Sequence, residues 1–276
     1  SGGSNDFIED GCDGEFPNRV TETLDLSDPD SAYLDDDDLS WTRVGDMALA
    51  RHFHNLVTLA DGTVMAVGGI ACDNGHPPPD HQDGEEHTEA DFEAFATRTA
   101  ELWNPETGLW CELAEQDSAR MYHSTALLLP DATVLSMAGG QRQVTINHEN
   151  GEIFTPPYLL TGDPRPELSI IAPDPIQYGS QFVVNLPPNP PVGWDDIDRF
   201  TLVGLASTTH GFDQATRFMT LGPPTQIINE TAALVEAPDT PAQMLPGWYM
   251  LFAISTDGVP SVARYVKLAK SGDGGG

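Results

Sequence analysis

The stretch that decides the fold lies at residues 119–131 and reads ARMYHSTALLLPD. An earlier stretch, residues 50–62, reads ARHFHNLVTLADG and repeats the same order: an Ala-Arg pair, ring side chains, an apolar run and an aspartate turn. A glycine pair follows each copy, at residues 68–69 and 139–140, so the copies lie roughly 70 residues apart. We therefore predict one unit used twice, each copy forming a β-hairpin whose final glycines let backbones approach closely.

A second pattern lies between the copies, at residues 99–110, which read TAELWNPETGLW and predict a strand, a turn and a strand. A Gly-Gly strand, this hairpin and an arginine at the entry to the next strand are together typical of a kelch-type propeller blade. A closed ring needs about four blades or more, and the sequence supplies two to three. We predict a partial kelch-type β-propeller over residues 19–160.

The remainder of the chain predicts a separate all-β domain. A stiff linker, TGDPRP at residues 161–166, is followed by short alternating apolar stretches separated by turn residues. About a hundred residues with this pattern is typical of an immunoglobulin-like β-sandwich, which we place at residues 161–270. Residues 1–18 and 271–276 are rich in Gly, Ser and acidic residues and predict a flexible N-terminal segment and a flexible tail.

The composition excludes some partners. The chain has 43 acidic and 12 basic residues and a formal net charge of −31, so it repels nucleic acid and anionic lipid. We expect an acidic, halophilic protein of an extracellular or cell-surface setting, in high salt. No stretch is long and apolar enough to predict a membrane span. The three cysteines, Cys12, Cys72 and Cys111, match no zinc motif; they permit one disulfide and a free thiol, or three thiols.

The residues with the clearest chemistry are Tyr122, His123 and His210. Neighbouring side chains on a strand point to opposite faces, so Tyr122 and His123 can share a metal only where the backbone turns at the strand's end. Phenolate and imidazole are good copper ligands. His210 lies in TTHGF, on a predicted turn between sandwich strands, where a loop tip can deliver a ligand. We predict that the three converge on one copper ion. The alternative is structural: Tyr122 would be a core tyrosine beside a hydrogen-bonded His123, and His210 would be an exposed histidine in a turn.

Several longer motifs carry a resemblance to a known family. From residue 47 to residue 269 the chain resembles the C-terminal part of the galactose oxidase and glyoxal oxidase family of copper-radical oxidases, in its last kelch-type blades and its immunoglobulin-like C-terminal domain. The matching stretches, in chain order, are ARHFH (50–54), RMYHS (120–124), EIFTPPYL (152–159), TTH (208–210), QATRF (214–218), LPGWYMLF (245–252) and GVPSVA (258–263).

The resemblance implies specific roles. Tyr122 would be the axial phenol and general base toward the substrate, His123 and His210 would be equatorial copper ligands, and Phe53 would line the substrate pocket. The family oxidises a primary alcohol or aldehyde with O₂ and releases hydrogen peroxide, using one copper ion and a radical on a tyrosine crosslinked to a cysteine. No position in this chain matches that tyrosine and that cysteine, so the Tyr-Cys radical cofactor is not encoded in residues 1–276.

Two functions follow from these observations. In the first, the chain belongs to a galactose/glyoxal oxidase-like copper protein that acts on a small alcohol, aldehyde or sugar and on O₂. Another chain or an N-terminal segment would then complete the propeller and supply the radical tyrosine. In the second, the chain is a non-catalytic secreted binding or structural module that keeps the kelch and sandwich folds. The sequence leaves both open, and with them the question of whether this chain is an enzyme.

Overall fold

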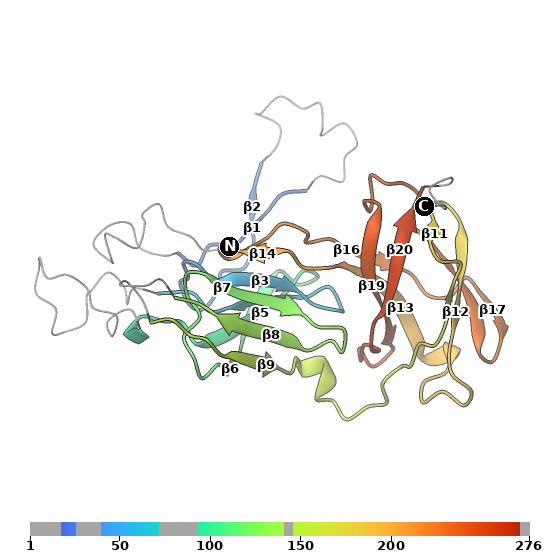
Figure 1. The fold of residues 1–276 in the computed structure, drawn as a ribbon, viewed down its shortest axis with the longest axis horizontal. Coiled ribbons are helices and arrows are strands. Elements are labelled where there is room, and N and C mark those ends of the chain that lie inside the picture. The colour runs from blue at the N-terminus through green and yellow to red at the C-terminus, as the bar shows by residue number, and fades with distance from the viewer. Residues whose placement is uncertain (1–17, 26–39, 72–92, 141–145, 271–276) are drawn as a thin grey trace, which may run out of the picture. The chain divides into compact units, whose positions relative to one another are not determined.

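The computed structural model describes residues 18–25, 40–71, 93–140 and 146–270 (Figure 1). Except for Asn18, the predicted flexible segments 1–18 and 271–276 lie outside these residues, as do Cys12 and Cys72. The chain forms two compact units, neither continuous in sequence: Ser1–Leu56, Val64–Thr125 and Met137–Glu152 form one, and Val57–Thr63, Ala126–Ser136 and Ile153–Gly276 the other. Among the described residues, no helix is both long and apolar enough to cross a membrane.

The two predicted repeats form two small antiparallel sheets, so the chain is all-β in this region as expected (Figure 1). The first copy enters a four-stranded sheet of order β3-β4-β5-β6, and the second a three-stranded sheet of order β7-β8-β9. A short pair, β1-β2, precedes them. The strands are β1 (Glu22–Thr23), β2 (Thr42–Arg43), β3 (Asn55–Thr58), β4 (Val64–Val67), β5 (Thr99–Asn104), β6 (Leu109–Glu115), β7 (Ser124–Leu128), β8 (Val134–Ala138) and β9 (Gly151–Phe154).

The arginine of each repeat is fully buried and holds its sheet together. Arg51 donates to Glu101 from Nε at 3.0 Å and from Nη2 at 2.7 Å, and to the Gly68 carbonyl at 2.9 Å. Arg120 donates to Glu152 at 3.0 Å and to the Ala138 carbonyl at 2.9 Å. A buried guanidinium needs such partners, because an unpaired charge in the interior is costly. The arginine of each repeated Ala-Arg pair therefore links strands of its own sheet.

The hairpin turns of the two copies are also built alike. Leu59 N–H donates to the Thr63 carbonyl, and Leu129 N–H to the Thr133 carbonyl, both at 2.8 Å. In each turn an aspartate, Asp61 or Asp131, accepts from the backbone N–H and the hydroxyl of the threonine two residues later. Aspartate side chains favour turns by this kind of local hydrogen bond.

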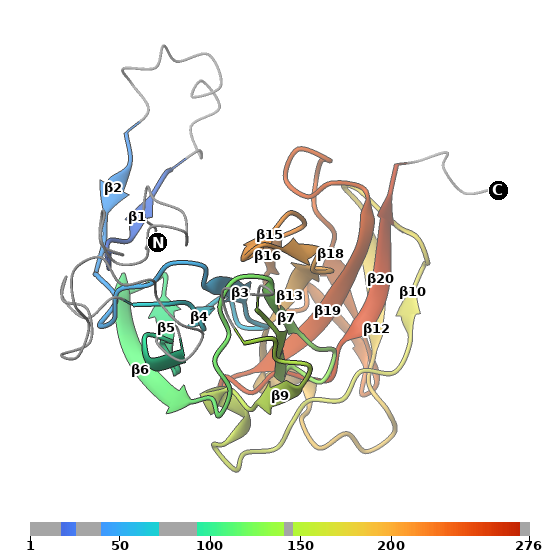
Figure 2. The same cartoon turned by 60° about the vertical axis from the view of Figure 1, so that its left-hand side comes forward.

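The later part of the chain forms the predicted sandwich of two sheets (Figure 2). One sheet has the order β10-β12-β18-β17 and the other the order β11-β20-β19-β13-β16. A small hairpin, β14-β15, projects between β13 and β16. The elements are η3 (Pro157–Leu159), β10 (Ile171–Ala172), β11 (Ile176–Gln177), β12 (Gln181–Asn185), η4 (Trp194–Asp196), β13 (Ile197–Gly204), β14 (Thr208–Thr209), β15 (Phe212–Asp213), β16 (Phe218–Leu221), β17 (Gln226–Asn229), β18 (Ala232–Glu236), β19 (Gly247–Ser255) and β20 (Arg264–Ala269).

The five-stranded sheet is buried on both faces. Alternate residues such as Phe200, Leu202 and Leu251 fill the core between the sheets. Thr201 and Phe252, which alternate with them, are also 0% exposed. Side chains on opposite faces of a strand are both buried only when both faces are covered. The second covering layer includes a propeller turn, because Thr201 Oγ1 donates to the Ala60 carbonyl at 2.7 Å.

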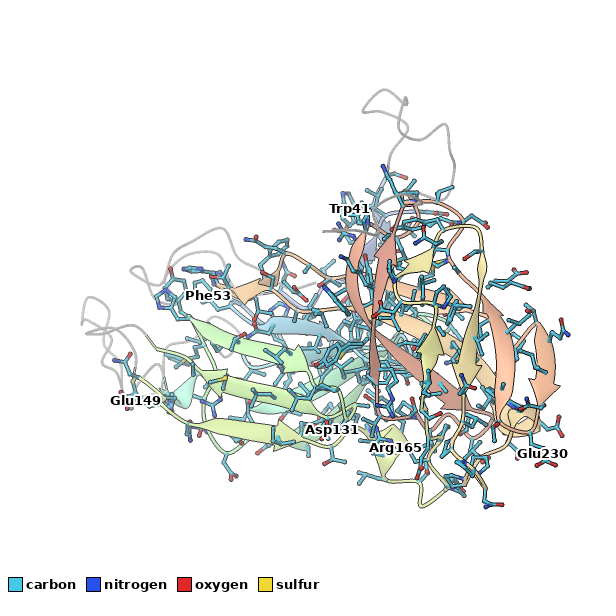
Figure 3. The ribbon with its side chains drawn as sticks, turned by 45° about the vertical axis from the view of Figure 1, so that its right-hand side comes forward. Trp41, Phe53, Asp131, Glu149, Arg165 and Glu230 are labelled. Carbon is cyan, nitrogen blue, oxygen red and sulfur yellow. The ribbon has the colours of Figure 1, made fainter. Side chains whose placement is uncertain are left out.

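The second propeller turn is attached to the same unit by three donors. Ala263 N–H donates to the Pro130 carbonyl and the Tyr158 hydroxyl to the Ala132 carbonyl, both at 2.7 Å. Arg165 donates to the Asp131 carbonyl; both side chains are marked in Figure 3. Both hairpin turns therefore belong structurally to the sandwich unit, although their strands continue into the other unit.

Candidate functional site

Tyr122 and His123 lie on a turn immediately before β7. Ser124 N–H donates to the Met121 carbonyl at 3.0 Å and closes the turn, and His123 has a left-handed φ of 62°. This turn breaks the strand alternation, so the two rings lie together: their centroids are 3.9 Å apart and their planes are inclined by 37°. The left-handed region is uncommon for a residue with a side chain, and such residues cluster at functional sites.

The backbone after β8 fixes the orientation of His123. Its Nδ1 lies 3.1 Å from the Gly140 carbonyl, while Gly140 N–H donates to the Tyr122 carbonyl at 2.7 Å. A carbonyl oxygen only accepts, so Nδ1 carries the proton and the lone pair of the neutral imidazole is on Nε2. Hydrogen bonds of this kind determine which nitrogen of a histidine can bind a metal.

Phe53 and His52 extend the group of rings. Phe53, marked in Figure 3, meets Tyr122 edge-on with centroids 5.1 Å apart, and the His52 ring stacks on Phe53 at 3.7 Å. We call His52, Phe53, Tyr122 and His123 the aromatic cluster. Burial lowers the pKa of His52 below its ordinary value, which favours the neutral ring. The sequence assigned no role to His52, because two histidines flank Phe53 and spacing alone does not select one.

His210 lies at the apex of the β14-β15 hairpin, in the sandwich unit. Thr208 pairs with Asp213 and Thr209 with Phe212, so His210 and Gly211 form the turn. His210 is exposed and has a φ of 55°, and its Nδ1 lies 2.7 Å from Thr209 Oγ1. The hairpin therefore presents His210 at its tip, as the sequence predicted locally.

The structure thus brings Phe53, Tyr122 and His123 together within one compact unit, while His210 belongs to the other. Convergence of the three predicted ligands remains a prediction. Within the described part of the chain there is no group of three or more His, Cys, Asp or Glu side chains placed to bind a metal. The predicted set differs from such a group, because it combines two imidazoles with a phenol.

The donor chemistry of Tyr122 and His123 fits copper. Oxygen and imidazole nitrogen suit tetragonal Cu(II). Because His123 Nδ1 is engaged in the hydrogen bond to the Gly140 carbonyl, Nε2 is the nitrogen that could bind the metal. The left-handed backbone at both His123 and His210 is the kind of local strain that a folded protein keeps where ligands must be held in place.

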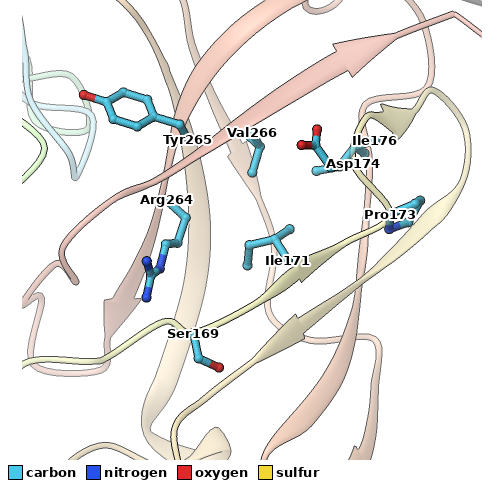
Figure 4. A pocket seen from close by; sticks show the side chains of 8 residues that line it. All are labelled: Ser169, Ile171, Pro173, Asp174, Ile176, Arg264, Tyr265 and Val266. Carbon is cyan, nitrogen blue, oxygen red and sulfur yellow. The ribbon is translucent and has the colours of Figure 1, made fainter. Parts of the chain in front are cut away.

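A cavity of about 140 Å³ lies elsewhere, in the sandwich (Figure 4). Its lining includes Ser169, Asp174, Arg264 and Tyr265, and none of the predicted site residues. Arg264 Nε donates to the Leu168 carbonyl at 2.7 Å, which gives this arginine a structural partner. The cavity contributes nothing to the predicted copper chemistry.

Comparisons with known proteins agree with the fold and the motifs. Residues 165–268 match the family described as "Galactose oxidase-like, Early set domain". A galactose oxidase of Gibberella zeae is 27% identical over 228 residues, which cover 80% of this chain and 30% of that protein. "Aldehyde oxidase GLOX" of Vitis pseudoreticulata is 35% identical over 162 residues, which cover 54% of this chain and 30% of that protein.

One solved structure matches nearly the whole chain. It is described as a novel fungal alcohol oxidase of the AA5 family in complex with copper, with 25% sequence identity and a TM-score of 0.76. The match covers 97% of this chain and 50% of that one, so this chain spans half of that protein and 30% of the two curated relatives. The order of blade hairpins and sandwich confirms the predicted fold class, and these matches confirm the predicted resemblance to the galactose oxidase and glyoxal oxidase family.

Proposed function

We propose that this chain supplies Tyr122, His123 and His210 to a single copper site of an alcohol or aldehyde oxidase. The observation that carries the proposal is the turn before β7, which places a phenol and an imidazole ring 3.9 Å apart. Bound copper would supply a Lewis acid and an electron acceptor for the substrate alcohol. The relatives named as galactose, alcohol and aldehyde oxidases support this substrate class.

The residues of the chain would have separate tasks. The Tyr122 oxygen would accept the proton of the substrate hydroxyl, as a positioned general base does. His123, held through Nδ1 by the Gly140 carbonyl, would keep its Nε2 on the metal. Phe53 packs against the edge of Tyr122 and would form an apolar wall for a small alcohol, aldehyde or sugar.

Oxidation with O₂ needs a second one-electron centre, and no position in this chain matches the family's crosslinked tyrosine and cysteine. We propose that further propeller blades supply it, from another chain or from another segment of the same protein. The net charge of −31 supports an extracellular or cell-surface setting of high salt, because an acidic surface stays soluble there. The absence of a match to the radical tyrosine and its cysteine is the observation behind the second candidate, a non-catalytic secreted binding or structural module that keeps the kelch and sandwich folds.

The test is a copper titration of the purified chain. Calorimetry measures the stoichiometry and affinity, and electron paramagnetic resonance identifies the ligand atoms. We expect one Cu(II) per chain, with nitrogen hyperfine structure in its spectrum. We expect this signal to be lost in the double variant Tyr122→Phe/His123→Ala and in the single variant His210→Ala. A triple variant of His76, His81 and His87 to alanine is the control. These histidines lie among acidic residues between the two repeats, and a segment of this composition is where a stray metal would bind if the proposed site did not. Loss of the signal only in the triple variant would contradict the proposed site.

A peroxide assay then separates the two candidates. The copper-loaded chain is mixed with a family propeller segment that contains the crosslinked tyrosine and cysteine, and peroxide is measured with small alcohols and aldehydes. Peroxide production that depends on Tyr122 supports the oxidase. Copper binding without peroxide under these conditions supports the non-catalytic module.

A further inference from the structure

A partly buried acid–imidazole pair, Glu93 and His148, lies in the same compact unit as the aromatic cluster but outside the predicted ligand set. His148 Nε2 lies 2.6 Å from Glu93 Oε1, and the two side chains are only 18% and 17% exposed. Arg98 Nη2 donates to the second Glu93 oxygen at 3.2 Å, and this arginine balances the charge of the carboxylate. Glu93 precedes β5 and His148 precedes β9, so the pair joins two successive sheets within one compact unit.

The backbone of His148 continues the connection to the predicted copper ligands. Its N–H donates to the Gly139 carbonyl at 2.9 Å. The next residue, Gly140, accepts from His123 Nδ1 and donates to the Tyr122 carbonyl. The Gly139–Gly140 segment is therefore held on one side by His148 and on the other by both predicted ligands.

The packing at Gly140 leaves this segment no room to move independently. Gly140 has a φ of +118°, and a Cβ added there would lie 2.5 Å from the Ile146 carbonyl oxygen and 2.7 Å from Asn147 Cα. Ile146 and Asn147, the two residues before His148, thus rest directly on the Gly140 backbone. Any displacement of His148 is transmitted to the carbonyl that orients His123, because packed backbone cannot absorb it.

We propose that Glu93 and His148 are positioning residues for the copper ligands. Glu93 anchors the His148 ring, His148 anchors the Gly139–Gly140 segment, and this segment orients His123 through its Nδ1 proton. The inference rests on the proposed copper site. Outer groups that orient a ligating histidine typically change metal affinity by about 10- to 100-fold when they are removed.

The experiment compares Glu93→Ala with Glu93→Gln in the full chain. The alanine variant leaves the His148 ring without its acceptor, and we expect copper affinity about 10- to 100-fold weaker with an altered paramagnetic spectrum. The glutamine variant keeps an acceptor oxygen and should restore most of the affinity. The control is Glu112→Ala, which removes an exposed carboxylate from β6 and should leave affinity and spectrum unchanged.

A measurement on the metal-free protein separates this proposal from the proposed function. Nitrogen-15 NMR of the imidazoles reports the His123 tautomer, and we expect the Nδ1-protonated form to dominate in the unchanged chain and in Glu93→Gln, but not in Glu93→Ala. Failure of the unchanged chain to bind copper, with this tautomer change present, overturns only the copper site. An unchanged His123 tautomer in a folded Glu93→Ala protein overturns the positioning role, with or without copper binding.

Discussion

At the scale of single residues, each blade depends on an arginine whose partner is distant in sequence. Arg51 and Glu101 are both 0% exposed, and burial lowers the pKa of Arg51 while the hydrogen bond to Glu101 opposes that shift. The sequence marks the arginines by their repeated Ala-Arg setting. It does not mark Glu101 or Glu152 as their partners, because many other acidic residues occupy similar strands and turns.

Replacing Glu101 should therefore lower the free energy of unfolding. Glu101→Ala leaves a buried guanidinium unpaired, and we expect a loss of about 3–5 kcal/mol of unfolding free energy in urea titrations. Arg43→Ala, which breaks the exposed pair with Asp46, is the control and should change stability little, since water screens exposed ion pairs. Equal effects of the two variants would contradict this view of the buried pair.

The lowered pKa of His52 has a consequence for pH dependence. Burial disfavours the charged ring, so the unfolded chain takes up a proton at a higher pH than the folded one. The contribution of His52 to stability is complete above the ordinary pKa of about 6.5 and is lost as pH falls through the folded value. We expect the loss of stability below about pH 6.5 to be smaller in His52→Gln. Parallel curves of unfolding free energy against pH for the two proteins would rule out this contribution.

The residues with positive φ near the site were only partly predictable from the sequence. The aspartate turns and the break before β7 follow from residue type and from the need to bring Tyr122 and His123 together. The positive φ of Phe53 does not follow, because in the second copy the left-handed residue is His123, whereas Phe53 aligns with Tyr122. The two entry turns thus differ in shape despite similar sequences, because tertiary packing fixes the backbone there.

At the scale of elements, the hairpins are built alike and differ at one turn position. The first turn has Gly62 with a φ of +94°, and a Cβ there would lie 2.7 Å from Phe218 Cζ. The second turn has Ala132 with a φ of 66° at the equivalent position. The alanine methyl is buried there, whereas the Phe218 ring occupies that space beside the first turn.

Exchanging the two residues should therefore have unequal effects. Gly62→Ala adds left-handed strain of about 1–2 kcal/mol and a clash with Phe218, and should lower the melting temperature. Ala132→Gly relieves strain but removes a buried methyl worth about 0.8 kcal/mol, so its net effect should be small. Scanning calorimetry measures both, and combining Gly62→Ala with Phe218→Leu should recover part of the loss. A melting temperature unaffected by Gly62→Ala would show that Phe218 moves away without cost.

The hydroxyl of Tyr158 offers a second test at this scale. Burial raises its pKa, and the hydroxyl donates to the Ala132 carbonyl of the second turn at 2.7 Å. Tyr158→Phe leaves that buried carbonyl without this donor, and we expect a loss of about 1–2 kcal/mol in chemical unfolding. Tyr265→Phe, at a half-exposed side chain, is the matched control. A loss of similar size in the control would argue against the buried hydrogen bond as the cause.

The strands themselves were only partly predictable. Strands β5, β12, β13, β19 and β20 fall in stretches whose apolar residues predict strands, such as QFVV (181–184), FTLV (200–203) and WYMLF (248–252). Strands β16, β17 and β18 were not recognised. The alanines of β18 have little intrinsic preference for strands, and all four residues of β17 are exposed at the edge of its sheet. Pairing with β12 makes β18 a strand, and such a tertiary cause leaves no local pattern.

At the scale of the whole molecule, the comparisons confirm an all-β fold of the galactose oxidase type over 97% of the chain. The repeat, the linker and the sandwich length were sufficient to predict that fold. The discontinuous composition of the compact units was not predictable, because segments 57–63 and 126–136 join the sandwich unit through backbone carbonyls that every sequence possesses.

The net charge of −31 makes the stability of the whole chain sensitive to salt. Repulsion among exposed carboxylates opposes the compact state, and ions screen it over about 10 Å at 0.1 M ionic strength. We expect the melting temperature to rise as NaCl is increased from low to molar concentration. Sucrose of matched osmolality is the control for solvent exclusion. Equal stabilisation by both solutes would mean that charge repulsion contributes little.

The attachment of the hairpin turns to the sandwich limits how this protein can be recombined. Chimeras that take the sandwich from one relative and the blades from another would pair foreign loops with the donors at Thr201, Tyr158 and Ala263. A crossover at the linker of residues 161–166 would therefore separate the two hairpin turns from the sandwich residues that hydrogen-bond to them. Productive shuffling would have to carry the two short loops at 57–63 and 126–136 along with the module that binds them.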